Sequence, residues 1–357
     1  MPSVSDEVSK LIEQGQQKKI STQSIVGIFT QNRWESIDPL GVGETAFDLS
    51  SLTKVLATTT LVAKATQVGK FNVDQPLDQA FGEIFNYFQV NHKKAWLENF
   101  KPYTWTHVLG HCAQLPWRIN FFDHFESFEA KLTNQLRQKI IQKSLELLVH
   151  QPLEHATDRK IVYSDPGFQL LGLYLEVLYQ KRLKEIFDSE LPPEYSEKLS
   201  FEPTKFSKIA PTEECPWRKR RLQGEVHDEN ASLWGGDAGH AGLFGTISGC
   251  QKIFTAWFPQ QKSFLTEATK AQFCSGPVVG KTDGLYAFRK GWDTPLSLIK
   301  SGWSESSFGH WGFTGVGAWF DPERQWGMIL LSNQVYFGRD KTQYRAWRDE
   351  LFTRQKN

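Results

Sequence analysis

Residues 47–54 read FDLSSLTK and lead into a segment whose apolar residues recur at helical spacing. On a helix, positions i and i+3 share a face with about 5–6 Å between their β-carbons. The hydroxyl of Ser51 is therefore expected beside the amine of Lys54. A lysine whose pKa is lowered by burial can take the serine proton, and a helix N-terminus stabilises developing negative charge. The pattern predicts a nucleophilic serine assisted by a lysine.

The same four-residue pattern occurs again at Ser297 and Lys300, and its context separates the two cases. A Ser-Lys hydrolase needs a third group on a facing lobe, commonly Tyr-x-Asn or Ser-x-Asn. Of the nine tyrosines, only Tyr163 has Asn or Asp two residues later, namely Asp165. This tyrosine lies downstream of Ser51 but upstream of Ser297, so only Ser51 fits the expected order.

A strand motif of the Lys-Thr-Gly type should complete such a site. His310-Trp311-Gly312 runs directly into an apolar hairpin, where an edge strand is needed. His240-Ala241-Gly242 lies in a glycine-rich loop and fits less well. The order Ser51, Tyr163, His310 is self-consistent.

Strand patterns stand at both ends of the chain and helical patterns stand between them. An α+β fold follows, in which an antiparallel sheet is flanked by helices and a helical lobe is inserted. We expect one domain, with an α/β lobe of residues 1–60 plus 225–357, a helical lobe of 61–224, and a cleft between them. The expected strands are 24–30, 34–37, 315–320 and 327–331, and the expected helices are 7–18, 51–68, 130–148, 168–183 and 343–353.

Composition limits the partners of this 357-residue chain. The net charge is +1, from 41 basic and 40 acidic residues, so no bulk field attracts nucleic acid. No run approaches the ~20 apolar residues of a membrane span. The first residues show no secretory signal, which favours a cytoplasmic location, or a periplasmic one if the true start lies upstream. Four scattered cysteines are expected to be free thiols: Cys112, Cys215, Cys250 and Cys274.

These motifs carry a resemblance to the serine β-lactamase and penicillin-binding protein superfamily. The chain is most similar to the class C β-lactamase-related esterases and D-alanyl-D-alanine carboxypeptidases. The resemblance spans roughly residues 20–335. Its matching segments are residues 47–54, 69–77, 104–111, 163–168, 223–231, 238–244 and 309–315.

The resemblance implies a role for each matched residue. Ser51 would be the acylated nucleophile, and Lys54 would tune its neighbours or shuttle the proton. Tyr163 would be the general base for acylation and would help to activate the deacylating water. The N–H groups of Ser51 and Phe313 would form the oxyanion hole. No cofactor or metal is implied.

The resemblance implies that Asp165, His310, Trp311 and Gly312 bind the substrate. The first three of these residues depart from the family pattern. Asp165 stands where the family has Asn, so it either pairs with Lys54 or caps the helix that starts near residue 166. His310 replaces a lysine and is mostly neutral at pH 7, so a permanent cation for a substrate carboxylate is lost. Trp311 replaces a small hydroxyl residue. The last two changes favour a neutral, ester-like acyl substrate over penicillin.

The glycine-rich region carries residues that invite other interpretations. His227, His240 and Asp228 lack the spacing of a helical zinc motif, so loop hydrogen bonding is expected. The glycines at 235, 236, 239, 242 and 245 indicate tight turns near the site.

The sequence thus predicts a serine acyl hydrolase acting through Ser51 on an ester or amide of small-molecule or peptide type. One alternative is a D,D-carboxypeptidase or endopeptidase acting on cell-wall peptides. Another is a non-catalytic binding or sensor protein on the same fold. The oligomeric state does not follow from the sequence.

Overall fold

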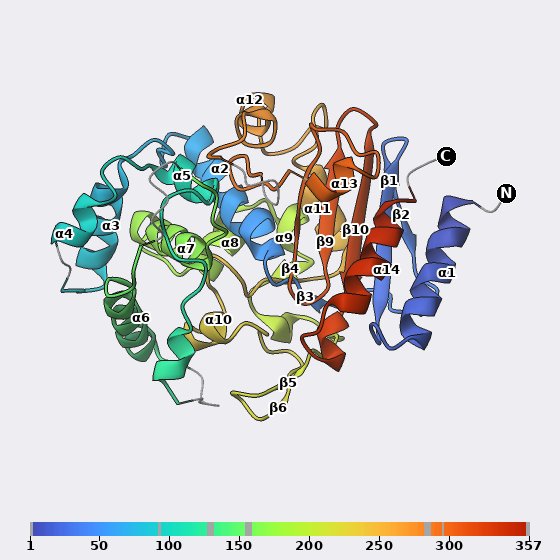
Figure 1. Cartoon of the computed structure of the whole chain (residues 1–357), viewed down its shortest axis with the longest axis horizontal. Helices are drawn as coiled ribbons and strands as arrows, with labels where there is room; N and C mark the ends of the chain where they lie inside the picture. Colours follow the sequence, from blue (N-terminus) through green and yellow to red (C-terminus); the bar gives the residue numbers. More distant parts are fainter. Residues whose placement is uncertain are drawn as a thin grey trace.

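The computed structural model describes residues 3–91, 94–126, 132–153, 159–281, 287–294 and 296–354. Its centre is a five-stranded antiparallel sheet in the order β2-β1-β10-β9-β8 (Figure 1). The strands are β1 (Ser24–Thr30), β2 (Arg33–Ile37), β8 (Phe308–Trp311), β9 (Gly317–Asp321) and β10 (Trp326–Ser332).

A strand near the start of the chain and a strand near its end pair within this sheet. Strand β1 pairs with β10 in antiparallel register, with Val26 opposite Leu330. Gln31 and Asn32 turn the chain from β1 into β2 at φ 50° and 61°, a left-handed pair that suits a tight hairpin. The expected sheet at both chain ends is confirmed, as is the hairpin of β9 and β10.

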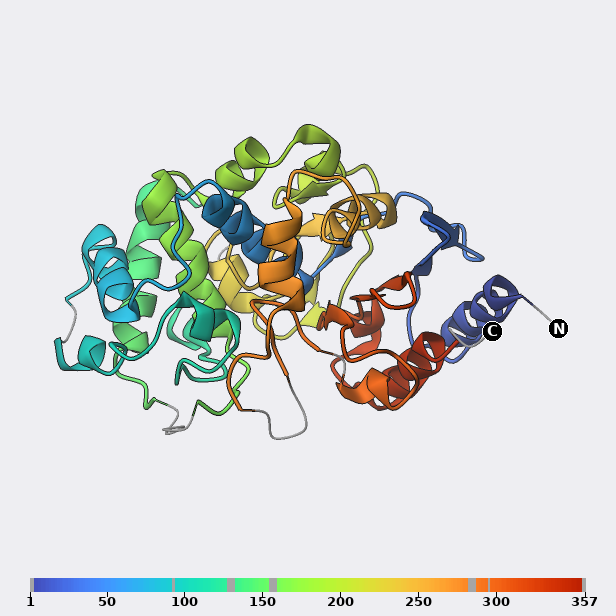
Figure 2. The same ribbon diagram turned by 90° about the horizontal axis from the view of Figure 1, so that it is seen from above.

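Alternation along β1 gives the sheet two apolar faces. Val26 and Ile28 belong to a core with helices α1 (Val4–Gln17) and α14 (Thr342–Phe352). Ile25 and Phe29 face the larger core on the other side. Helices α1 and α14 lie side by side against the sheet (Figures 1 and 2).

The segments between the two ends of the sheet are mostly helical and extend away from it (Figure 2). This agrees with the expected antiparallel sheet carrying an inserted helical lobe; the exact lobe boundaries stay a prediction. The helices are α2 (Thr60–Gln67), α3 (Leu77–Tyr87), α4 (Lys94–Glu98), α5 (Trp105–Leu109), α6 (Asn134–Leu148), α7 (Asp165–Tyr179), α8 (Leu183–Glu190), α9 (Pro193–Ser196), α10 (Glu229–Leu233), α11 (Ile247–Thr255), α12 (Glu267–Lys270) and α13 (Leu296–Ile299).

Shorter elements complete the described chain. Strands β3 (Phe47–Asp48), β7 (Phe244–Gly245) and β4 (Leu199–Ser200) form a small sheet, and β5 (Glu214–Cys215) pairs with β6 (Arg220–Arg221). The remaining helical turns are η1 (Lys54–Thr59), η2 (Phe121–His124), η3 (Pro203–Lys205), η4 (Ala271–Ser275) and η5 (Gln334–Phe337).

Two expected helices differ in detail. The helix expected over 51–68 begins with a π-helical turn, η1, before α2 continues it, and Gly69 follows at φ 72°. The helix expected over 168–183 ends at Tyr179, because Gln180 adopts a left-handed conformation at φ 53°. Part of the helix expected over 130–148 lies outside the described residues, and α6 begins at Asn134.

Candidate active site

Strand β3 and the turn after it present Ser51 next to Lys54. Ser51 follows Ser50, a non-glycine residue at φ 47°. Lys54 is the first residue of η1, and its Nζ lies 3.1 Å from the Oγ of Ser51. The i, i+3 spacing therefore brings the hydroxyl and the amine together as expected.

Lys54 is fully buried and has three further partners, one of which is the hydroxyl of Tyr163. Its Nζ lies 2.7 Å from an Asp165 carboxylate oxygen and 3.1 Å from the carbonyl oxygen of His240. Burial would lower the pKa of Lys54, but the charge of Asp165 and the hydroxyl of Tyr163 outweigh it and raise the pKa. Lys54 is thus a charged ammonium at neutral pH, rather than the neutral amine that burial alone would give.

Asp165 pairs with Lys54, which decides between its two earlier interpretations. The helix α7 is capped by the side chain of Ser164, which accepts a hydrogen bond from the N–H of Gly167 at 3.1 Å. Because Ser164 supplies the cap, the Asp165 carboxylate is available to the lysine.

Tyr163 completes the group around the serine. Its hydroxyl forms hydrogen bonds with both Lys54 and Ser51. Burial raises the pKa of Tyr163, the ammonium of Lys54 opposes this, and the carboxylate of Asp165 adds to it, so the net pKa is raised. Ser51, Lys54 and Tyr163, which the sequence motifs predict to act together, are therefore in contact.

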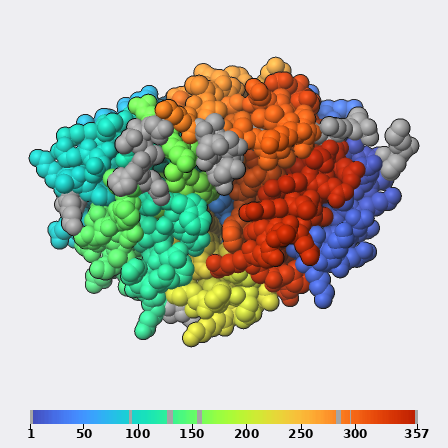
Figure 3. Space-filling model, viewed as in Figure 1, coloured from blue at the N-terminus to red at the C-terminus, as the bar shows by residue number. Residues whose placement is uncertain are grey.

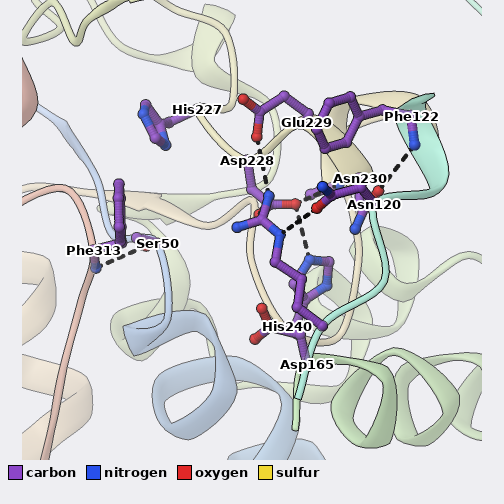
Figure 4. A network of polar contacts seen from close by, with 12 residues as sticks. Ser50, Asn120, Phe122, Asp165, His227, Asp228, Glu229, Asn230, His240 and Phe313 are labelled. Atoms are coloured by element: carbon purple, nitrogen blue, oxygen red, sulfur yellow. Dashed lines mark hydrogen bonds and ion pairs between the residues drawn. The ribbon is translucent and has the colours of Figure 1, made fainter. Parts of the chain in front are cut away.

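The turn from β8 into β9 lies against the residues that lead to Ser51. A Cβ added at Gly312 would lie 2.4 Å from a methyl carbon of Val316 and 2.9 Å from the carbonyl oxygen of Leu49, so this close approach requires glycine. The N–H of Phe313, expected in the oxyanion hole, donates to the Oγ of Ser50 at 3.0 Å (Figure 4). Ser50 is a site residue that the sequence reasoning missed.

The two other residues expected at the substrate lie on β8. His310 is buried, and burial together with the charge of Lys54 lowers its pKa to about 3, so it is neutral near pH 7. Trp311 packs its ring on Phe352 and under the guanidinium of Arg348, at 4.8 and 4.0 Å. Both line the site, although the Trp311 ring is partly held by α14.

A cavity of about 490 Å³ lies over these residues. On the face shown in Figure 3, the surface is hollowed beside α14, which is drawn in red. The cavity wall includes residues that the sequence reasoning did not assign to a site: Ser50, Trp117, Arg118, Glu229, Phe288, Asp293, Arg339, Lys341, Tyr344, Arg345 and Arg348.

Four of these residues are basic and fall within ten positions, at 339, 341, 345 and 348. This cluster of basic residues is the feature of the sequence that could have indicated the wall of the cavity. Arg339 is neutralised by Glu213 and Glu229. Lys341 donates to the carbonyl of Phe313, and burial lowers its pKa to about 7 despite the opposing charge of Glu213. Arg348 pairs with Asp349 at 2.6 Å, and within the described chain Arg345 has no ion pair, so Arg345 is the guanidinium of this wall that no carboxylate neutralises.

The histidines of the glycine-rich region take part in hydrogen bonds and ion contacts. His240 Nε2 lies 2.9 Å from Asp228 (Figure 4). Arg118 contacts both Asp228 and Glu229, at 3.8 and 3.2 Å. His227 Nε2 lies 3.0 Å from Glu213. Three or more metal-ligating side chains do not gather anywhere in the part of the chain that the structure describes.

Other expectations concern the whole chain. All four cysteines are buried free thiols. Among the described residues, no helix has both the length and the apolar character needed to cross a membrane. Gly235, Gly236 and Gly242 have φ between 92° and 116°, which confirms tight turns at these three positions, whereas the tight turn expected at Gly245 is wrong, because Gly245 lies in strand β7.

Comparison with known proteins supplies relatives over most of the chain. An N-acetylmuramyl-L-alanine amidase of Bacillus subtilis is 29% identical over 82% of this chain and 68% of its own length. A putative D-alanyl-D-alanine carboxypeptidase of Salmonella agona is 26% identical over 83% of this chain and 71% of its own.

Solved structures share the fold at low identity. EstCE1, a hydrolase with promiscuous acyltransferase activity, has a TM-score of 0.70 at 16% identity, and the match covers 98% of both chains. A class C beta-lactamase has a TM-score of 0.69 at 17% identity over 99% of this chain and 96% of its own. The family model described as Beta-lactamase matches residues 32–352, so the chain belongs to the beta-lactamase family.

Proposed function

We propose that this protein is a serine acyl hydrolase that forms an acyl-enzyme on Ser51 from an ester or amide. The observation that carries the proposal is the contact of Ser51 with both Lys54 and Tyr163 on the wall of the cavity. A hydroxyl becomes an effective nucleophile when an adjacent group removes its proton.

The hydrogen-bond pattern supports a route for that proton. Lys54 is charged and donates to the Oγ of Ser51, so the serine proton is left to face the Tyr163 oxygen. The phenolate form of Tyr163 accepts the proton. It is a minor form at neutral pH because burial raises the pKa of Tyr163, and the Lys54 ammonium is the charge that stabilises it. The Ser51 oxygen then bonds to the acyl carbon, and the carbonyl electron pair moves to its oxygen.

Collapse of the tetrahedral intermediate breaks the bond to the leaving group, which takes the proton back from Tyr163. Water then attacks the acyl-enzyme, with the same tyrosine as base. The bond between the acyl carbon and the Ser51 oxygen breaks, the acid is released, and Tyr163 returns the proton to Ser51. In each half-reaction Tyr163 passes the proton that it removed from the attacking group to the departing group, so no cofactor is needed for the balance.

The β8 residues favour an ester or a D-amino-acid amide over a β-lactam. His310 is neutral, and the ring of Trp311 occupies space that a small hydroxyl residue would leave open. Neither offers a fixed cation to a substrate carboxylate. We therefore place an esterase or D-amino-acid peptidase ahead of a true β-lactamase.

The basic wall supports a second candidate, a D,D-carboxypeptidase or endopeptidase on cell-wall peptides. Lys341 and Arg345 line the cavity and offer positive charge to a terminal carboxylate, which His310 does not, whereas Arg348 is already paired with Asp349. The names of the curated relatives, an amidase and a putative carboxypeptidase, agree with such a substrate. This candidate requires a location outside the cytoplasm, whereas the first fits either compartment.

The test is the intact mass of the protein after incubation with a fluorophosphonate, a penicillin or a p-nitrophenyl ester. Wild type is compared with Ser51→Ala and with Ser297→Ala, the serine of the second Ser-x-x-Lys pattern. We expect adducts that Ser51→Ala abolishes and Ser297→Ala retains. A lasting penicillin adduct supports the peptidase, whereas adducts from phosphonate or ester alone support the esterase. No Ser51-dependent adduct from any probe refutes the hydrolase and favours a binding protein.

A further inference from the structure

We propose that the hydroxyl of Ser50 is a direct donor in the oxyanion hole and connects the Phe313 N–H to the reacting oxygen of the substrate. The inference rests on the proposed function, because it needs an acyl substrate attacked by Ser51. It changes the expected hole, in which Phe313 itself would contact the substrate.

The geometry at Ser50 carries the proposal. Its Oγ accepts the Phe313 N–H at 3.0 Å, and Ser50 lines the same cavity as Ser51 (Figure 4). The residue is only 6% exposed. The N–H that should meet the substrate oxygen is thus already bonded to a side chain beside the nucleophile.

Asp48 fixes both partners of this contact. Its carboxylate accepts the N–H of Ser50 at 2.8 Å and the N–H of His227 at 2.6 Å. Its carbonyl accepts the hydroxyl of Thr314 at 2.7 Å, next to Phe313. These bonds hold Ser50 at φ 47°, a conformation that serine rarely adopts. Strained backbone that is held in this way occurs most often at functional sites.

A hydroxyl can accept one hydrogen bond and donate another at the same time. The Oγ of Ser50 accepts from Phe313, while its own proton has no acceptor among the residues that the structure describes. Hydrogen bonds in a chain polarise one another, so the Phe313 N–H strengthens the Ser50 hydroxyl as a donor. The N–H of Ser51 likewise donates to no described group and can supply the second bond.

In the tetrahedral intermediate the negative oxygen would accept from the Ser50 hydroxyl and the Ser51 N–H. No proton is transferred to it: the Ser50 hydrogen stays on its oxygen throughout. This contribution appears only as charge develops, so removing it should lower the acylation rate rather than substrate binding.

The experiment compares wild type with Ser50→Ala and Ser50→Gly. Glycine relieves the positive φ, so Ser50→Gly keeps the test valid even if Ser50→Ala folds poorly. Ser144→Ala, which removes a buried hydroxyl that bonds Trp234 far from the nucleophile, is the matched control. The readouts are the acylation rate and KM for a p-nitrophenyl ester and the inhibition constant of phenylboronic acid, which forms a tetrahedral adduct with a serine.

We expect both Ser50 variants to acylate about 10²-fold more slowly, as for loss of one oxyanion donor, with KM changed less than about twofold. The boronic acid should bind more weakly to both, and Ser144→Ala should change neither value. Unchanged or faster acylation in Ser50→Gly overturns the inference, because it means that Ser50 only covers the Phe313 N–H. A failure of the proposed function itself is distinct, since wild type would then show no acylation that Ser51→Ala abolishes.

Discussion

The ion pair between Lys54 and Asp165 makes a sharp prediction for Asp165→Asn. The pair is buried, with side-chain exposures of 0% and 15% and a separation of 2.7 Å. At an effective dielectric constant of about 20, Coulomb's law gives roughly 6 kcal/mol of gross attraction at that distance. Removing one partner of a buried pair costs about 3–5 kcal/mol in measured cases. Asparagine keeps an oxygen that can accept from Lys54, so we expect a loss of about 3 kcal/mol at pH 7.

The loss should depend on pH in a defined direction. In wild type the pKa of Lys54 is raised, so the pair contributes its full stability below the ordinary lysine pKa and loses it above. In Asp165→Asn burial dominates, the Lys54 pKa falls below its ordinary value, and stability drops as the pH falls below about 10. The difference in unfolding free energy between wild type and Asp165→Asn is therefore largest near pH 7 and becomes smaller as the pH rises to about 10 and above.

Urea unfolding at pH 7 and pH 10 measures both effects. Asp188→Asn is the control, because Asp188 pairs with Lys205 at 2.9 Å with both side chains nearly half exposed. An exposed pair contributes about 0–1 kcal/mol. Equal unfolding free energies of wild type and Asp165→Asn at pH 7 would refute the assignment of a charged Lys54.

Three further changes test other parts of the site. Gly312→Ala places a Cβ 2.4 Å from Val316, so we expect the β8–β9 turn to shift, the acylation rate to fall at least tenfold and stability to drop by about 1–3 kcal/mol in urea unfolding; wild-type values in both assays would contradict this. Gly239→Ala places a Cβ 2.0 Å from the carbonyl oxygen of Phe168, and we expect the free energy of unfolding to fall by about 3 kcal/mol in the same assay. The control is Gly82→Ala, which should not lower the free energy of unfolding, because the space around that Cβ is open. Lys341, whose pKa is about 7, should bind a carboxylate-bearing ester more weakly as the pH rises from 6 to 8, seen as a rising KM that Lys341→Met makes flat; a neutral ester with the same rise would show that Lys341 is not the cause.

The sequence could predict that Ser51 and Lys54 lie together because their spacing is local. Ser51 and Lys54 are three residues apart on one helical turn, so backbone geometry alone brings them together. Tyr163 and His310 were found through motif order, and the structure places both at the same cavity. The hairpin of β9 and β10 was equally accessible, because its two apolar runs flank a short polar turn.

What could not be predicted depends on contacts across long stretches of chain. The bond from Phe313 to Ser50 joins two loops, and no pattern of residue types marks it. Arg345 and Arg348 read as an ordinary solvated helix face until α14 is seen beside the cavity. The sequence left two roles open for Asp165, an ion pair with Lys54 or the cap of the helix. Only the folded structure shows that Ser164 caps the helix, so that the Asp165 carboxylate pairs with Lys54.

The pairing of β1 with β10 constrains when the site can exist during synthesis. Residues 24 and 332 are neighbours in the sheet, so the central strand pair stays incomplete until almost all of the described chain has been made. Contacts of such wide separation carry a large loop-closure cost and slow folding. Phe313 follows β8 in the same late-forming sheet, whereas Ser51 precedes it by far in the chain. A nascent chain would therefore carry Ser51 long before the turn that holds Phe313, and the contact between Phe313 and Ser50 would form only with the closing strand.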